Sequence, residues 1–149
     1  MDVTSLKIGA ALEKGAALHL KHPILEHLMY SGEGADKYGR LVDKKKPHKA
    51  IRLILKHPEA PSVIDAMREI DRIKATGEDV SVGTIGVKYF FALLVGWEGI
   101  GVNGEDESEC TEFNAKAFFD SEFGDMVGKR QVIPFVTSGK NFAANFATA

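Results

Sequence analysis

A run of apolar residues near the middle of the chain predicts a helix that is enclosed on every side. Between Val87 and Val95 the one charged residue is Lys88, so a helix drawn here has no polar face. Such a helix is normally surrounded by other elements, and the run is shorter than the roughly 20 residues that a membrane span needs. We therefore predict a buried central helix over residues 84–98, ended by Gly99, because glycine adopts the left-handed conformation of a helix C-terminus without strain.

The first 60 residues are patterned for strands. Leu18 to Lys21 and Ile51 to Lys56 alternate apolar and polar residues with a period of about two, which is typical of half-buried strands. A proline follows each segment and closes it. We predict a small antiparallel sheet or hairpin within residues 1–60. The pattern leaves the conformation of residues 1–17 and 24–50 open.

Residues 61–149 are patterned for helices. Ser62 has an acidic residue three positions later, as in a capping box, and apolar residues then recur every three or four positions as far as Ile73. Gly77 ends this helix, which we expect to pack against the central helix as a hairpin.

Further helices are predicted toward the C-terminus. Thr111 is the residue type preferred at an N-cap, and helices are predicted over residues 112–122 and 126–136. Pro134 should break or kink the second of these, because it has no N–H to donate. A short terminal helix or a loose tail follows, with residues 143–149 as the expected tail. The whole pattern indicates an α+β, mainly α fold in a single domain, residues 1–149, with four to five helices around the central one.

Composition adds few constraints. The length of 149 residues suits one domain, and the formal net charge of −2 gives no general attraction to nucleic acid or to an anionic membrane. The single cysteine, Cys110, excludes an intrachain disulfide. The N-terminus has neither the basic residues nor the apolar segment of a signal peptide. These features predict a soluble intracellular protein.

Residue types that carry catalysis or bind metals form no recognisable motif. Zinc needs three or four converging ligands, and the histidines do not have the spacing of the helical metalloprotease pair. Glu107, Glu109 and Glu112 should raise the pKa of the Cys110 thiol and weaken it as a nucleophile. We therefore predict no catalytic residues, no cofactor and no metal site. The histidines in question are His19, His22, His27, His48 and His57.

Two segments could instead bind a macromolecule. The basic segment Lys44 to Lys49 could contact phosphates, although it has no interleaved aromatics on which bases could stack. Near the C-terminus, Phe135, Phe142 and Phe146 are candidate partner-binding residues, because clustered exposed aromatics mark protein-binding surfaces. The alternative is that these rings cover the central helix.

The second half of the chain carries an ordered set of features. An apolar helix runs into Gly96-Trp97-Glu98-Gly99-Ile100, and a turn follows at Asn103-Gly104-Glu105. A helix then opens with Phe113-Asn114-Ala115-Lys116-Ala117-Phe118, and the set closes with Asn141-Phe142. In this order the features resemble the tail assembly chaperones of long-tailed bacteriophages, the lambda-like and related siphophage families. The resemblance covers residues 88–142.

The resemblance implies a non-enzymatic protein that binds and solubilises the tape measure protein and helps to recruit tail tube subunits. It implies a homo-oligomer in the cytoplasm of the infected host, absent from the mature virion. It also implies contact with the tail tube protein through a frameshifted, extended form of the chain. We expect no membrane association. A small DNA-contacting phage or bacterial regulator that uses residues 44–49 is the second hypothesis.

Overall fold

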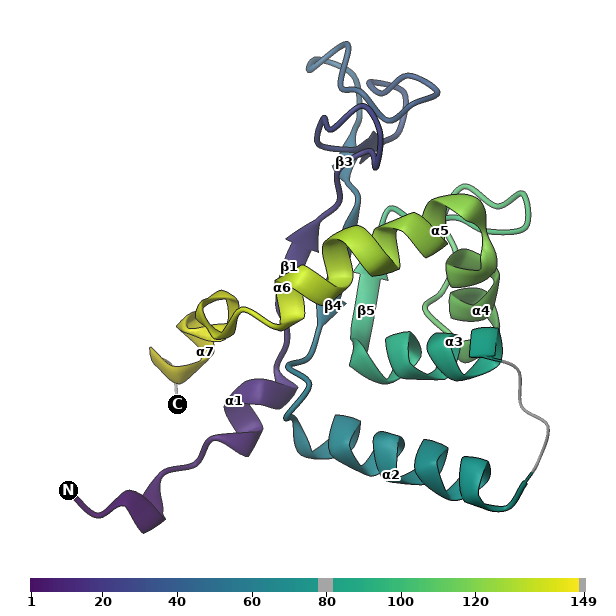
Figure 1. The fold of residues 1–149 in the computed structure, drawn as a ribbon. Coiled ribbons are helices and arrows are strands. Elements are labelled where there is room, and N and C mark those ends of the chain that lie inside the picture. Colours follow the sequence, from purple (N-terminus) through teal and green to yellow (C-terminus); the bar gives the residue numbers. More distant parts are fainter. Residues whose placement is uncertain (78–81, 148–149) are drawn as a thin grey trace.

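The computed structural model describes residues 1–77 and 82–147 and has the predicted α+β, mainly α architecture (Figure 1). The strands are β1 (Ala16–His19), β2 (Tyr30–Ser31), β3 (Lys49–Ala50), β4 (Arg52–Leu55) and β5 (Leu94–Glu98). The α-helices are α1 (Gly9–Glu13), α2 (Pro61–Ala75), α3 (Val82–Leu93), α4 (Glu112–Asp120), α5 (Glu122–Val127), α6 (Ile133–Val136) and α7 (Ala144–Ala147). Shorter turns are the 3-10 helices η1 (Val3–Ser5) and η3 (Gly139–Phe142) and the π-helical η2 (Gly128–Val132).

An antiparallel three-stranded sheet in the order β1-β4-β5 joins the two halves of the chain. Leu53 on β4 pairs with Leu18 on one side and with Trp97 on the other. Strands β2 and β3 form a separate antiparallel pair. The predicted N-terminal sheet is therefore confirmed, but its third strand comes from the helical part of the sequence.

The predicted central helix over residues 84–98 is wrong in its second half. Helix α3 ends at Leu93, and residues 94–98 form β5 along the edge of β4. A continuous apolar run suits a buried helix and a buried strand equally well, and here the edge of β4 provides the hydrogen-bond partners. Gly99 has a φ of +73°, so the predicted left-handed glycine is present but ends a strand.

Two N-cap residues were predicted, and the structure contradicts the first, Ser62, and confirms the second, Thr111. Ser62 is not the N-cap of α2; that position is Ala60, whose side chain makes no capping hydrogen bond. The Ser62 N–H donates instead to the Glu13 carboxylate on α1, at 2.6 Å, so a distant residue supplies the acceptor. Thr111 is the predicted N-cap of α4, and its Oγ1 accepts from the Asn114 N–H at 3.2 Å.

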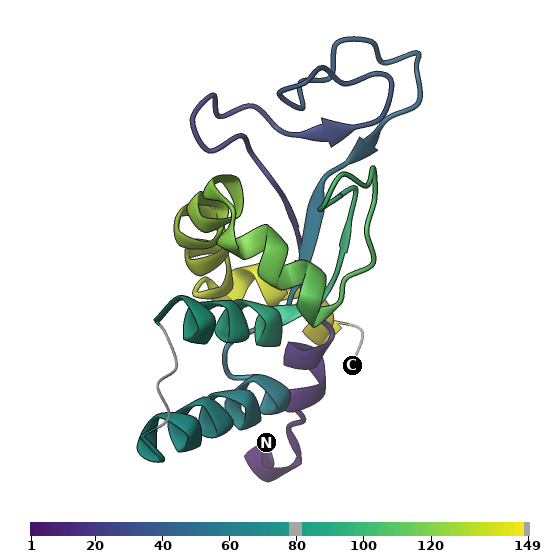
Figure 2. The ribbon, with the colours of Figure 1, turned by 90° about the vertical axis from the view of Figure 1, so that its right-hand side faces the viewer.

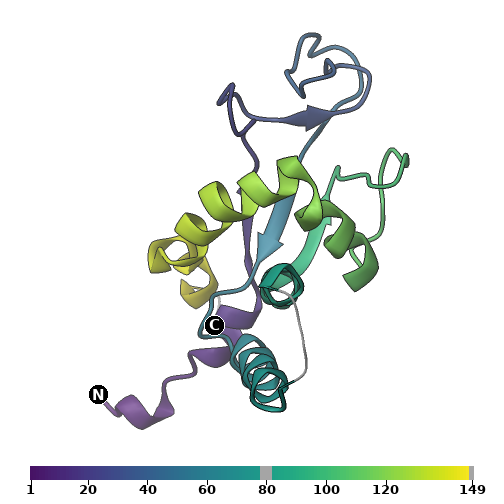
Figure 3. The same cartoon turned by 45° about the vertical axis from the view of Figure 1, so that its right-hand side comes forward.

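The C-terminal helices differ from the prediction mainly in their ends. Ser121 ends α4 and caps α5 by accepting from the Gly124 N–H at 3.0 Å, so the helix predicted over residues 112–122 ends at Asp120, and the one predicted to begin at residue 126 begins at Glu122. Pro134 lies in the first turn of α6, where no N–H is needed, and the wider turn of η2 precedes it. The chain therefore stays helical across this proline, so the predicted break is absent and the π-helical turn stands in its place. Figures 1 and 3 show the rod of α5, η2 and α6 crossing one face of the sheet.

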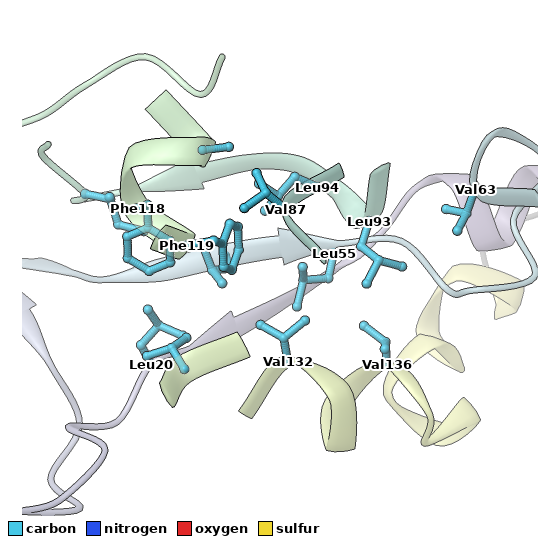
Figure 4. Close-up of a cluster of buried hydrophobic side chains, with 14 of the residues drawn as sticks. Leu20, Leu55, Val63, Val87, Leu93, Leu94, Phe118, Phe119, Val132 and Val136 are labelled. Atoms are coloured by element: carbon cyan, nitrogen blue, oxygen red, sulfur yellow. The ribbon is translucent and has the colours of Figure 1, made fainter. Parts of the chain in front are cut away.

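The main core lies between this rod, the sheet and α3 (Figure 4). The fully buried side chains here include Leu53 and Leu55 from the sheet, Leu93 from α3 and Val132 from the rod. The Phe90 ring of α3 stacks on Phe119 with centroids 4.8 Å apart. Helix α2 lies beside α3 as predicted, with Val63 and Ile70 buried.

Residues 21–50 form a lobe that projects from the end of the sheet (Figures 2 and 3). This projecting lobe contains β2 and β3 and is otherwise built from turns. Its main internal apolar anchor is Met29, which is 9% exposed. The connector predicted around residues 78–83 falls partly outside the described residues, as does the end of the predicted tail at residues 148–149.

Candidate protein-interaction surface

The projecting lobe carries a group of exposed large apolar side chains. Ile24 is 61% exposed and Val42 is 65% exposed, values far above those of core residues. Exposed apolar side chains on a projecting element are accessible to other molecules. The full set on the lobe is Ile24, Leu25, Leu28, Tyr38 and Val42.

The loop from His22 to His27 holds two of these residues in a fixed geometry. His22 donates its N–H to the His27 carbonyl at 2.9 Å, and the Glu26 N–H donates to the His22 carbonyl at 2.9 Å. Nδ1 of His22 accepts from the N–H groups of Ile24 (3.2 Å) and Leu25 (3.0 Å). Glu26 adopts a φ of +67°, which is uncommon for a side chain of this size. A loop closed by hydrogen bonds therefore presents Ile24 and Leu25 to solvent.

The base of this loop is anchored to the helical rod. Gln131, on η2, donates its side-chain N–H to the Lys21 carbonyl at 2.7 Å and accepts from the Lys21 N–H at 2.8 Å. Arg130 Nη1 donates to the Pro23 carbonyl at 3.4 Å. The lobe therefore keeps a defined direction relative to the helices. The sequence pattern left the conformation of residues 24–50 open and did not predict this surface.

The three predicted C-terminal phenylalanines have different environments. Phe142 is 1% exposed and packs edge-on against His57, with ring centroids 5.2 Å apart. Phe135 is half-buried against the core and lies edge-on to Phe142. Phe146 is 44% exposed. Placing Phe142 on an exposed surface is therefore wrong, because its ring completes the core, and Phe146 is the one that a partner can reach.

The tail after residue 142 is attached to the body rather than loose along its described length. Residues 144–147 form α7, and Asn145 Nδ2 donates to the carbonyls of Ala11 (3.1 Å) and Gly15 (2.9 Å). These bonds tie the C-terminal turn to α1, near the N-terminus (Figure 1).

Two of the histidines hydrogen-bond to backbone carbonyls, and the single cysteine is partly buried. Among the described residues no group of three or more histidine, cysteine or acidic side chains could hold a metal ion. His27 Nε2 donates to the Tyr38 carbonyl at 2.8 Å, and His19 Nε2 donates to the Met29 carbonyl at 2.8 Å. The pKa of the Cys110 thiol is raised, as predicted, but the cause is burial rather than the neighbouring carboxylates.

Two apolar recesses flank the central helix and its sheet. One, of about 440 Å³, lies between α2 and α3 and has Ile70, Ile73 and Phe91 in its lining. The other, of about 480 Å³, lies beneath the lobe, with Met29 and Phe118 in its lining. The first recess is also lined by Lys56, Glu69, Lys88 and Glu112, whereas the lining of the second has no charged residue.

Comparison with protein families, with curated proteins and with solved structures finds no match to this chain. Within the described residues, no helix is both long and apolar enough to cross a membrane.

Proposed function

We propose that this chain is a tail assembly chaperone of a long-tailed bacteriophage. In this role it binds the tape measure protein, keeps it soluble and helps to recruit tail tube subunits in the cytoplasm of the infected host. The tube contact is made through a frameshifted, extended form of the chain, and the chaperone is absent from the mature virion. The pattern from Gly96-Trp97 to Asn141-Phe142 supports this assignment.

The observation that carries a protein-binding role is the exposed apolar group on the lobe. Ile24 and Leu25 stand on a loop whose backbone is already fixed, so docking a partner there orders little additional chain. A tape measure protein is a long helical chain with apolar stripes. Many copies of a small apolar surface bind such a client through avidity, although each contact is weak.

Co-expression with a tape measure fragment tests the proposal. The unmodified chain should keep the fragment soluble and co-purify with it. The pair Ile24→Ser and Leu25→Ser should lose the complex, because the exposed apolar contact is removed without touching the core. Phe146→Ser tests the remaining exposed C-terminal ring in the same assay.

A matched control uses exposed apolar residues on the helices. Ile64 is 39% exposed on α2 and Phe113 is 76% exposed on α4, so Ile64→Ser with Phe113→Ser removes similar area elsewhere. Retention of the complex by the lobe variant, or its equal loss in the control, would remove the lobe from the proposal. Failure of the unmodified chain to bind any segment of the tape measure protein would overturn the function itself.

DNA binding by residues 44–49 is the second candidate. Lys44, Lys45 and Lys46 are exposed and open to phosphates. Retention on a DNA column that falls steeply with salt, and that disappears in Lys44→Glu with Lys45→Glu, would favour this candidate.

A further inference from the structure

A basic loop of the lobe lies beside an acidic loop that follows β5. Residues 44–49 contain four lysines, and residues 105–112 contain five carboxylates and no basic residue. Lys49 Nζ lies 2.6 Å from Glu107 Oε1, and the same carboxylate accepts from the Gly99 N–H at 3.1 Å. A recess of about 660 Å³ lies between the loops, with Gly32, His48 and Asp106 in its lining.

Most charged side chains of the two loops make no ion pair within the described part of one chain. In the described parts of the structure, the ammonium groups of Lys44, Lys45 and Lys46 make no ion pair, and all three side chains are exposed. The carboxylates of Asp106 and Glu109 are likewise exposed and unpaired within residues 1–77 and 82–147.

The lysines project from an ordered loop rather than from a flexible tail. Asp43 Oδ1 accepts from the Lys45 N–H at 3.0 Å, and the Asp43 carbonyl accepts from the Lys46 N–H at 3.3 Å. Gly34 donates its N–H to the Pro47 carbonyl at 3.0 Å, which ties this loop to the preceding one. The conformation of the basic loop is therefore set by its own hydrogen bonds. Within one molecule Lys49 pairs with Glu107 and Lys88 with Glu112, and the remaining charged side chains of the two loops are exposed.

We propose that a second copy of this chain docks on this end of the molecule, so that the basic loop of each copy faces the acidic loop of the other. Adjacent patches of opposite charge are complementary to themselves when related by a two-fold axis. This arrangement brings Lys44, Lys45 and Lys46 of one copy opposite Asp106 and Glu109 of the other, twice over. Val42 lies beside the basic loop and adds apolar area to the contact.

This inference concerns contacts between copies and does not depend on the client that the lobe binds. The proposed client-binding residues Ile24 and Leu25 lie on a different loop of the lobe. A dimer that keeps them free would present two client-binding surfaces in one particle.

Molar mass in solution, measured by light scattering or sedimentation, tests the inference with a charge swap. The unmodified chain should dimerise at about 0.1 M salt and dissociate toward monomer at about 1 M, where the Debye length falls to about 3 Å. The basic-loop variant Lys44→Glu, Lys45→Glu, Lys46→Glu and the acidic-loop variant Asp106→Lys, Glu109→Lys should each be monomeric. In each of them the dimer dissociation constant should rise at least about tenfold.

Mixing the two reversed variants should restore a dimer that contains one copy of each, because both loop pairs are again opposite in charge. A control with the same charge change on other elements, Lys7→Glu, Lys74→Glu, Lys140→Glu, should dimerise like the unmodified chain. A monomer at every salt concentration, or no dimer on mixing although both variants keep the native circular dichroism spectrum, would overturn the proposal. Unchanged mass with lost retention on DNA in the basic-loop variant would assign that loop to nucleic acid instead.

Discussion

Phe142 and Phe146 are four positions apart and have opposite environments. The aromatic ring of Phe142 is enclosed between Phe135 and His57, whereas that of Phe146 is 44% exposed. Both residues are phenylalanines in the same short segment, so the sequence alone does not show which ring is buried and which is exposed. The difference arises from η3, which turns Phe142 toward the core.

Replacing Phe142 by alanine should destabilise the protein strongly. A phenylalanine removed from a packed core costs about 3–5 kcal/mol, the sum of lost burial and the cavity left behind. Phe146→Ala should change the free energy of unfolding by less than about 0.5 kcal/mol. Chemical denaturation of both variants measures the two values, and similar losses would contradict the burial of Phe142.

Gly124 is required by a close approach of two helices. A Cβ at this position would lie 1.8 Å from the Phe118 carbonyl oxygen, whereas a Cβ at Gly139 would meet nothing within 4 Å. Gly124→Ala should therefore cost at least about 1–3 kcal/mol, because the α4–α5 junction has to open. Gly139→Ala should leave the melting temperature equal or slightly higher. Thermal unfolding of the pair is the measurement.

At the scale of elements, sequence patterns located helices better than they located their ends. The amphipathic spacing of α2 and the N-cap type of Thr111 are local signals, and both elements lie where they were predicted. Residues 94–98 form a strand, because β4, the partner that decides between helix and strand, lies 39 (Leu55 to Leu94) to 46 (Arg52 to Glu98) positions earlier in the chain. Ser62 failed as a cap for the same reason: its N–H is bound by Glu13, which no local pattern reveals. Ile24 and Leu25 went unnoticed because exposure depends on tertiary packing.

The cap from Glu13 to α2 should be pH-dependent. The hydrogen bond from the Ser62 N–H holds the pKa of the Glu13 carboxyl below its usual value, with lesser help from the Ser62 hydroxyl and Lys56. A lowered folded-state pKa gives stability that is fully present above the unfolded value, about 4.3, and is lost as pH falls through the folded value. Glu13→Ala should cost about 0.5–2 kcal/mol at neutral pH, like other lost helix caps. The difference from the unmodified chain should shrink below about pH 4 in denaturation curves; a constant difference would contradict the charged cap.

On the scale of the whole molecule, the two halves are interleaved. Strand β5 pairs with β4, Gln131 binds Lys21, and Asn145 binds the carbonyls of Ala11 and Gly15. The predicted division into a β-rich part, residues 1–60, and a helical part, residues 61–149, therefore describes the order of the sequence and not separable units.

A single cooperative transition should result from this interleaving. Far-ultraviolet circular dichroism and tryptophan fluorescence should give the same midpoint in denaturant, because Trp97 lies on the strand that joins the halves. Residues 1–60 expressed alone should lack native structure, since β4 then has one neighbour instead of two. Two separated transitions would contradict this prediction.

The side-chain amide of Gln131 also protects the sheet from unwanted growth. β1 is an outer strand, and the backbone N–H and carbonyl of Lys21 extend its open edge beyond His19. A glutamine amide that fills both positions imitates the backbone of a neighbouring strand, so the N–H and carbonyl of Lys21 are not available to pair with a foreign strand. A protein that carries exposed apolar residues on the adjoining loop thus has one side-chain amide blocking edge-to-edge pairing beside that loop.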